Sequence, residues 1–154
     1  MKLAAKKAAS RLGAVQALYQ MDVVGKGLPD VLAEFESHWL GRTIEGDTYH
    51  PANAELFREI VTGVLRDQYV IDRAVDEALA NGWPLKRIEA LLRAVLRAGY
   101  WEILNRPKTP ARVLITEYID VAAAFFDSEE CGMVNAVLNN LAQGTRAAEL
   151  GAKG

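Results

Sequence analysis

Apolar residues recur every three or four positions along almost the whole chain, which is the pattern of amphipathic α-helices. The spacing predicts an alanine-rich first helix that ends before Gly25, followed by helices over about residues 30–40, 51–65, 67–79, 85–104, 109–126 and 128–144. The segment 67–79 either continues the third helix or restarts it. No segment alternates with period two for long enough to predict a strand. The pattern therefore predicts an all-α protein, a compact bundle of about seven helices with short connections.

Helix-breaking and capping residues support these limits. Gly82 and Gly144 follow predicted helices, where glycine adopts the left-handed cap conformation without steric cost. Pro84 and Pro110 suit a first helical turn, because proline lacks the amide proton that the first turn leaves unpaired. Residues 41–53 carry glycine, proline and polar side chains and predict a loop.

Composition narrows the class of protein. The chain has 154 residues, 51% of them hydrophobic and 25% charged, which is typical of one globular domain. The single cysteine, Cys131, excludes an internal disulfide. No apolar run is long enough to span a membrane, and no apolar segment follows Lys6 and Lys7 as in a secretory signal. We therefore expect a cytoplasmic protein.

The charge is distributed unevenly, although the formal net charge is only −2. Residues 1–21 contain three lysines and Arg11 but no acid, and residues 86–112 contain seven basic residues against Glu89 and Glu102. Phosphate binding depends on the local field of a surface rather than on total charge. If the fold brings both segments together, they form a basic face; otherwise each is an ordinary solvated helix face.

Candidate catalytic and metal-binding groups are sparse. His38, Asp47 and His50 are the one combination of metal-ligand residues, but the histidines are twelve residues apart, which is not a helical ligand spacing. Cys131 lies near a predicted helix start beside two glutamates and has no histidine nearby in sequence, which favours an inert thiol. No glycine-rich phosphate loop is present. We expect no enzyme activity, no metal site and no cofactor.

Three stretches of sequence, taken together and in order, carry a family resemblance. They are residues 11–20 with Val15-Gln16-Ala17-Leu18-Tyr19, residues 92–104 ending in Tyr100-Trp101-Glu102-Ile103-Leu104, and residues 109–141 with Met133-Val134-Asn135-Ala136-Val137-Leu138. In this order they resemble the NusB family of bacterial transcription antitermination factors, from about Lys6 to Gln143.

The resemblance implies an all-helical fold of two three-helix-type sub-bundles packed crosswise, here about residues 1–80 and 83–146, with a flexible tail over 147–154. It implies binding of single-stranded boxA leader RNA and a heterodimer with NusE, a small-subunit ribosomal protein. Through RNA polymerase, the complex permits read-through of terminators, notably on ribosomal RNA operons. It leaves open whether the free protein forms a homodimer.

The expected RNA-binding residues lie on the first helix. Lys6, Lys7 and Arg11 supply positive charge, and Gln16 and Tyr19 supply groups that contact unpaired bases. Lys7 and Arg11 are four residues apart and therefore share one face of a helix. In the other interpretation, Tyr19 is a core residue and Gln16 is exposed without a binding role. Lys6 and Lys7 then only keep the end of the helix soluble.

The chain departs from the family pattern at two places. The family opening is often rich in arginine, whereas lysines predominate here, and lysine lacks the planar fork that binds phosphate. Met133 stands where an aromatic residue that stacks on a base is expected, so contacts of Met133 and Asn135 with RNA stay open. Glu129 matches an acidic family position near the partner surface.

Two other functions remain as alternatives. The first is a protein-binding helical adaptor of the same fold without RNA affinity. The second is the NusB-like domain that is fused to RNA cytosine methyltransferases, which we favour less because the sequence that ends at Gly154 contains no methyl-donor-binding domain.

Overall fold

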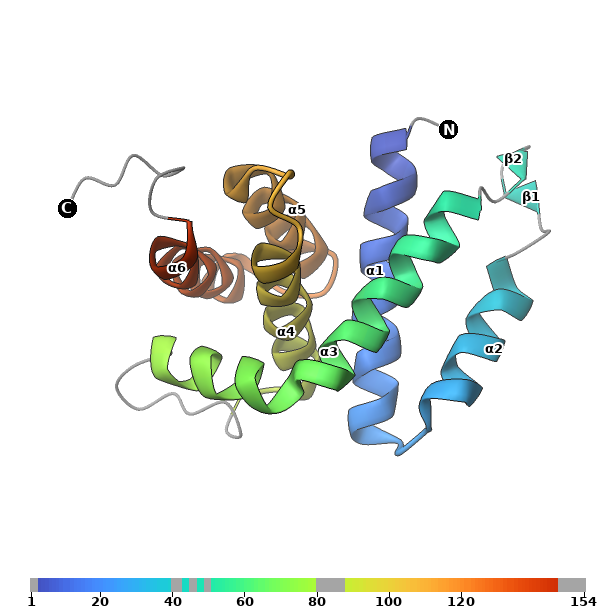
Figure 1. Ribbon diagram of the computed structural model, residues 1–154, viewed down its shortest axis with the longest axis horizontal. Helices are drawn as coiled ribbons and strands as arrows, with labels where there is room; N and C mark the ends of the chain where they lie inside the picture. Colours follow the sequence, from blue (N-terminus) through green and yellow to red (C-terminus); the bar gives the residue numbers. More distant parts are fainter. Residues whose placement is uncertain (1–2, 40–42, 45–46, 49–50, 80–87, 147–154) are drawn as a thin grey trace.

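The computed structural model describes residues 3–39, 43–44, 47–48, 51–79 and 88–146 (Figure 1). Within these ranges the elements are α1 (Leu3–Val23), α2 (Leu28–Trp39), β1 (Thr43–Ile44), β2 (Asp47–Thr48), α3 (Pro51–Ala78), α4 (Ala90–Asn105), α5 (Ala111–Ala123) and α6 (Ser128–Thr145). The prediction of an all-α protein is confirmed. The two strands form one antiparallel pair, Thr43 with Thr48 and Ile44 with Asp47, inside the segment predicted to be a loop.

The described residues form six helices rather than about seven, because α3 is continuous. Its 28 residues include both segments that the hydrophobic pattern allowed to be separate helices. No proline interrupts the junction near Asp67, so nothing breaks the ladder of backbone hydrogen bonds there. The predicted start of the next helix at residue 85, and the proposed sub-bundle boundary near residues 80–83, lie outside the described residues.

The other helix ends lie close to their predicted positions. Gly25 has a φ of 83° directly after α1, a conformation that glycine adopts without strain. Asp127 is the N-cap residue of α6, and Glu129 and Glu130 occupy its first turn. Differences are small: the helix predicted over about residues 109–126 corresponds to α5, which has Pro110 at its N-cap and ends at Ala123.

The helices gather into two groups that share α3. In Figure 1, α1 and α2 lie along the first half of α3, and α4, α5 and α6 gather on the opposite side of the molecule. The second half of α3 extends beneath α4 and α6, and α3 contacts α1, α2, α4 and α6. The long third helix therefore links both groups.

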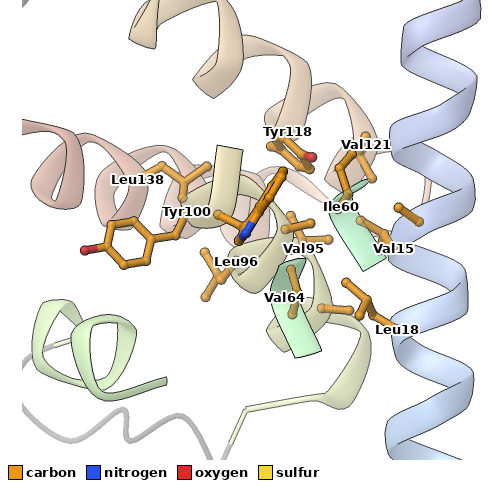
Figure 2. Close-up of a cluster of buried hydrophobic side chains, with 14 of the residues drawn as sticks. Val15, Leu18, Ile60, Val64, Val95, Leu96, Tyr100, Tyr118, Val121 and Leu138 are labelled. Atoms are coloured by element: carbon orange, nitrogen blue, oxygen red, sulfur yellow. The ribbon is translucent and has the colours of Figure 1, made fainter. Parts of the chain in front are cut away.

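The core is continuous from one group to the other, as Figure 2 shows. The labelled side chains come from five helices: Val15 and Leu18 of α1, Ile60 and Val64 of α3, Val95, Leu96 and Tyr100 of α4, Tyr118 and Val121 of α5, and Leu138 of α6. Most positions of the predicted apolar stripes are buried, while Leu12, Tyr19, Ile119 and Phe126 are only partly buried against the core. Among the described residues, no helix is long and apolar enough to cross a membrane.

Candidate nucleic-acid and partner interface

Lys6 and Lys7 lie about one turn after the start of α1 and are partly exposed. The hydroxyl of buried Ser10 donates a hydrogen bond to the carbonyl of Lys6 at 3.1 Å. Among the described residues, neither lysine ammonium forms an ion pair. The described part of the chain therefore contains no acid that neutralises these two charges.

Arg11 lies one turn further along and points into the molecule. It is only 5% exposed. Its Nε donates to Glu102 Oε2 at 2.7 Å and its Nη2 to Glu102 Oε1 at 3.2 Å, which makes a bidentate pair with α4. Nη1 also lies 3.3 Å from Glu117 Oε1 of α5. Arg11 thus links α1 to α4 and α5, and its contact with RNA phosphate stays a prediction.

Glu102 is fully buried, and its carboxylate interacts with Tyr118 and Arg106 as well as with Arg11. The hydroxyl of Tyr118 donates to Glu102 Oε2 at 2.5 Å, and Arg106 Nε lies 3.5 Å from Oε1. A buried carboxylate needs such partners because removal from water is costly. We name Arg11, Glu102, Glu117 and Tyr118 the buried charge cluster.

The cluster alters proton affinities in a consistent direction. Burial raises the pKa of the Tyr118 phenol well above its ordinary value, and the neighbouring Glu102 carboxylate raises it further. Burial alone would lower the pKa of Arg11, but the hydrogen bond and the charge of Glu102 outweigh burial and raise that pKa. The cluster therefore keeps a charged arginine and a neutral tyrosine inside the protein.

Gln16 and Tyr19 do not join Lys7 on one surface. Gln16 follows Lys7 by nine residues, about two and a half turns, and so projects from the opposite side of α1. Gln16 is exposed and lines a hollow of about 120 Å³ beside Glu34 and Phe35 of α2. Tyr19 is half-buried against the core. The five predicted RNA-binding residues therefore lie on different sides of one helix.

The second basic segment does lie next to the first, since α4 contacts α1. Arg93 and Arg97 of this segment, however, are paired with acids. Arg97 Nε and Nη2 donate to Asp72 of α3 at 2.7 and 2.9 Å, and Arg93 Nη2 donates to Asp22 of α1 at 2.7 Å. These contacts hold α4 against α1 and α3, so Arg93 and Arg97 do not add unpaired charge to the lysines of α1.

Glu129 lies at the edge of a groove of about 640 Å³ between the end of α3, the start of α4 and α6. The groove is lined by Ala78, Leu79, Ile88, Glu89, Leu92, Phe126, Glu129, Glu130, Met133, Ala136, Val137 and Asn140. Its floor is apolar, and the charged residues among these described lining residues are all acidic. Met133 belongs to the lining, whereas the exposed Asn135 side chain accepts a hydrogen bond from Asn139 Nδ2 at 2.7 Å.

The remaining candidate groups show no catalytic arrangement. Cys131 is partly buried, and its Sγ lies 4.0 Å from the carbonyl of Phe126. His50 and the side chains of His38 and Asp47 lie outside the part of the chain that the structure describes. Within that part, no three metal-ligand side chains gather.

Two features of this surface were missed from the sequence. Glu102 was counted only as an acid in a basic segment, yet its place among apolar residues at helical spacing is typical of a buried carboxylate that needs a cation. The groove beside Glu129 joins three segments that are far apart in sequence, so no local pattern identifies it.

Close relatives match nearly the whole chain. A transcription antitermination protein NusB of Bradyrhizobium diazoefficiens is 59% identical over 150 residues, covering 97% of this chain and 91% of the relative. The NusB protein of Nitrobacter hamburgensis is 59% identical over 148 residues, covering 96% of this chain and 92% of the relative.

Solved structures share the fold. A structure of T. maritima NusB matches this fold with a TM-score of 0.78 at 23% identity, covering 94% of this chain and 96% of that chain. A structure of the antitermination factors NusB and NusE with double-stranded RNA has a TM-score of 0.76 at 19% identity, covering 90% and 97%. The model of the NusB family matches residues 8–143. The chain belongs to the NusB family of transcription antitermination proteins, which are not enzymes.

Proposed function

We propose that this protein acts in the cytoplasm as an RNA-binding antitermination factor that binds boxA-type single-stranded leader RNA together with NusE. Bound in this way, it modifies RNA polymerase on ribosomal RNA operons. The observation that carries the proposal is the 59% identity to antitermination proteins over almost the full length of both chains. The related complex that contains NusE and RNA supports the choice of partners.

Lys6 and Lys7 are the proposed phosphate contacts on α1. Both are partly exposed, and both precede Arg11, the member of the buried charge cluster on α1, by about one turn. Arg11 acts behind them by fixing α1 to α4 and α5. Gln16 and Tyr19 project from other sides of α1 than Lys7. They can therefore contact only an RNA strand that passes around the helix.

NusE is the proposed occupant of the groove beside Glu129. The apolar floor offers contact area, and the charged residues in the described part of the lining are Glu89, Glu129 and Glu130. Such a rim favours a partner surface with lysine or arginine side chains around an apolar centre. Charge complementarity of this kind mainly accelerates association and fixes orientation.

The double substitution Lys6→Ala, Lys7→Ala tests the RNA surface. Affinity for single-stranded boxA-like RNA should fall, and the slope of log affinity against log salt should become shallower by about 0.7 for each phosphate that the variant no longer neutralises. Fluorescence anisotropy at several salt concentrations measures both quantities. A matched RNA duplex shows whether the site prefers single strands.

Lys26→Ala is the matched control, because Lys26 lies beyond the other end of α1 and pairs with Glu34. It should leave RNA affinity and salt slope unchanged, and circular dichroism should show intact helices in all variants. If the double variant binds RNA with the affinity and slope of the parent, the phosphate contacts lie elsewhere.

A protein-binding adaptor without RNA affinity is the second candidate. It is favoured by the pairing of Arg11, Arg93 and Arg97 with acids, which leaves few open cations on the described part of α1 and α4. NusE binding without measurable RNA binding, alone or in the presence of NusE, would establish this alternative.

A further inference from the structure

The connection between α4 and α5 carries an exposed lysine, Lys108. It lies between Arg106, the C-cap residue of α4, and Pro110, the N-cap residue of α5. Arg106 donates a hydrogen bond to Glu59 Oε1 at 2.7 Å. Lys108, in contrast, forms no ion pair with any residue that the structure describes. The connection therefore carries one positive charge that no described acid neutralises.

Two ion pairs show that α1 and α4 run antiparallel. Arg11 pairs with Glu102, and Asp22 pairs with Arg93. From the first pair to the second, the chain advances by eleven residues along α1 and goes back by nine residues along α4. The start of α1 therefore lies beside the end of α4.

This arrangement brings Lys6 and Lys7 to the same end of the molecule as Lys108. Lys7 precedes Arg11 by about one turn, so it lies beyond the contact with Glu102, in the direction of the end of α4. Figure 1 shows the start of α1 and the connection between α4 and α5 at the same, upper end of the molecule. The axes of packed helices are about 8–10 Å apart. A single nucleic-acid strand that crosses from α1 to this connection would thus meet cations on both elements.

Arg146 holds the connection in place. This residue directly follows α6. Its guanidinium donates to three backbone carbonyls: Nε to Ile103 at 3.0 Å, Nη2 to Arg106 at 2.8 Å and Nη1 to Thr109 at 2.7 Å. A cation is favourable there, because the last carbonyls of a helix have no partner within the helix.

Lys108 lies between two of these anchored residues. The amide of Thr109 also donates to the carbonyl of Arg106 at 3.1 Å, which closes the turn around Lys108. A side chain on a fixed backbone loses less conformational freedom when it binds a ligand than one on a mobile backbone. The turn therefore presents the lysine at little entropic cost.

We propose that Lys108 is a phosphate contact of the RNA surface, beside Lys6 and Lys7, and that Arg146 is the residue that positions it. The ligand is the backbone of single-stranded RNA. This inference rests on the proposed RNA-binding function and extends the surface from α1 to a second element. Phosphate contacts fix the orientation of a nucleic acid, so cations on two elements define the direction in which the strand crosses the protein.

Lys108→Ala tests the contact in the full chain with NusE present. Affinity for single-stranded boxA-like RNA should fall about fivefold at about 0.1 M salt, and the slope of log affinity against log salt should become shallower by about 0.7, as expected for one lost phosphate contact. Fluorescence anisotropy at several salt concentrations measures both quantities. Lys26→Ala, which removes a lysine beyond the other end of α1, is the matched control and should change neither.

Arg146→Gln tests the positioning role. RNA affinity should fall, because the guanidinium that holds the turn is removed. In the Lys108→Ala background the same substitution should have no further effect on RNA affinity, since the group that it positions is absent. The loss of stability, measured by urea unfolding, should be equal in both backgrounds. A purely structural role would make the effects on RNA affinity additive as well.

The outcomes separate this inference from the proposed surface on α1. If Lys6→Ala, Lys7→Ala weakens RNA binding while Lys108→Ala keeps the affinity and slope of the parent, the α1 surface is supported and the contact of Lys108 is overturned. Parental affinity in all the lysine variants would overturn both. An undiminished effect of Arg146→Gln in the Lys108→Ala background would overturn the positioning role.

Discussion

Lys7 and Arg11 are both cations on α1, four residues apart, but the protein uses them differently. Lys7 keeps contact with water, while Arg11 is 5% exposed and forms a bidentate pair with Glu102. Sequence spacing correctly placed both on one helix. It could not distinguish them, because the partner of Arg11 lies 91 residues away and becomes a neighbour only after α4 packs on α1.

Arg11→Ala should destabilise the protein by about 3–5 kcal/mol, the usual effect of removing one partner of a buried ion pair. The reason is Glu102, which is fully buried and would lose its bidentate cation. Urea unfolding followed by circular dichroism measures the change. The matched control Lys7→Ala should alter the free energy of unfolding by less than about 0.5 kcal/mol.

Adding Glu102→Gln to Arg11→Ala should recover part of the stability, because the uncompensated charge is then gone. An Arg11→Ala protein that unfolds at the urea concentration of the parent would show that the buried charge cluster contributes little to stability.

At the scale of elements, the crossing of α3 and α4 depends on a glycine. The indole of Trp101 occupies the space that a side chain at Gly63 would need. The hydrophobic spacing predicted both helices well, because each buries a stripe of apolar residues. It did not predict their close approach. From sequence alone, a glycine inside a helix indicates only low helix propensity, and the contact between Gly63 and the Trp101 ring is visible only in the folded protein.

Gly63→Ala should destabilise the protein by roughly 1–2 kcal/mol, because overpacking costs about 1–3 kcal/mol and better helix propensity returns at most about 1 kcal/mol. Gly132→Ala is the matched control: Gly132 is exposed within α6 and has no atom within 4 Å of an added Cβ. It should stabilise the protein slightly. Urea unfolding midpoints compare the two, and equal shifts in both variants would refute the steric explanation.

At the scale of the whole molecule, the proposed RNA surface and the proposed partner groove lie on different helices. The lysines belong to α1, while the groove is formed by α3, α4 and α6. The sequence predicted the all-α class and the family, because hydrophobic periodicity and the order of motifs can be recognised without knowledge of tertiary contacts. It could not predict how many cations stay open, because the ion pairs Arg93–Asp22 and Arg97–Asp72 join separate helices.

RNA and NusE should bind cooperatively, because the described part of α1 and α4 offers few unpaired cations and bound NusE would supply more. Coupling between two ligands is typically about 1–3 kcal/mol, roughly 5- to 150-fold in affinity, and must be equal in both directions. Titration calorimetry in both orders of addition measures it.

Lys6→Ala, Lys7→Ala should weaken RNA binding while leaving NusE binding in the absence of RNA intact, and Glu129→Lys should weaken NusE binding. Identical RNA affinity with and without saturating NusE would instead indicate independent sites.

The length of α3 has a consequence for how the chain can be divided. Ile60 and Val64 in its first half and Ile71 and Val75 in its second half are all fully buried, and its partners include helices of both groups. If the backbone were cut between α3 and α4, the first fragment would expose the apolar face of α3. The helices that bury this face, α4 and α6, would belong to the second fragment. The two fragments would behave as subunits of an obligate heterodimer, folded only in each other's presence.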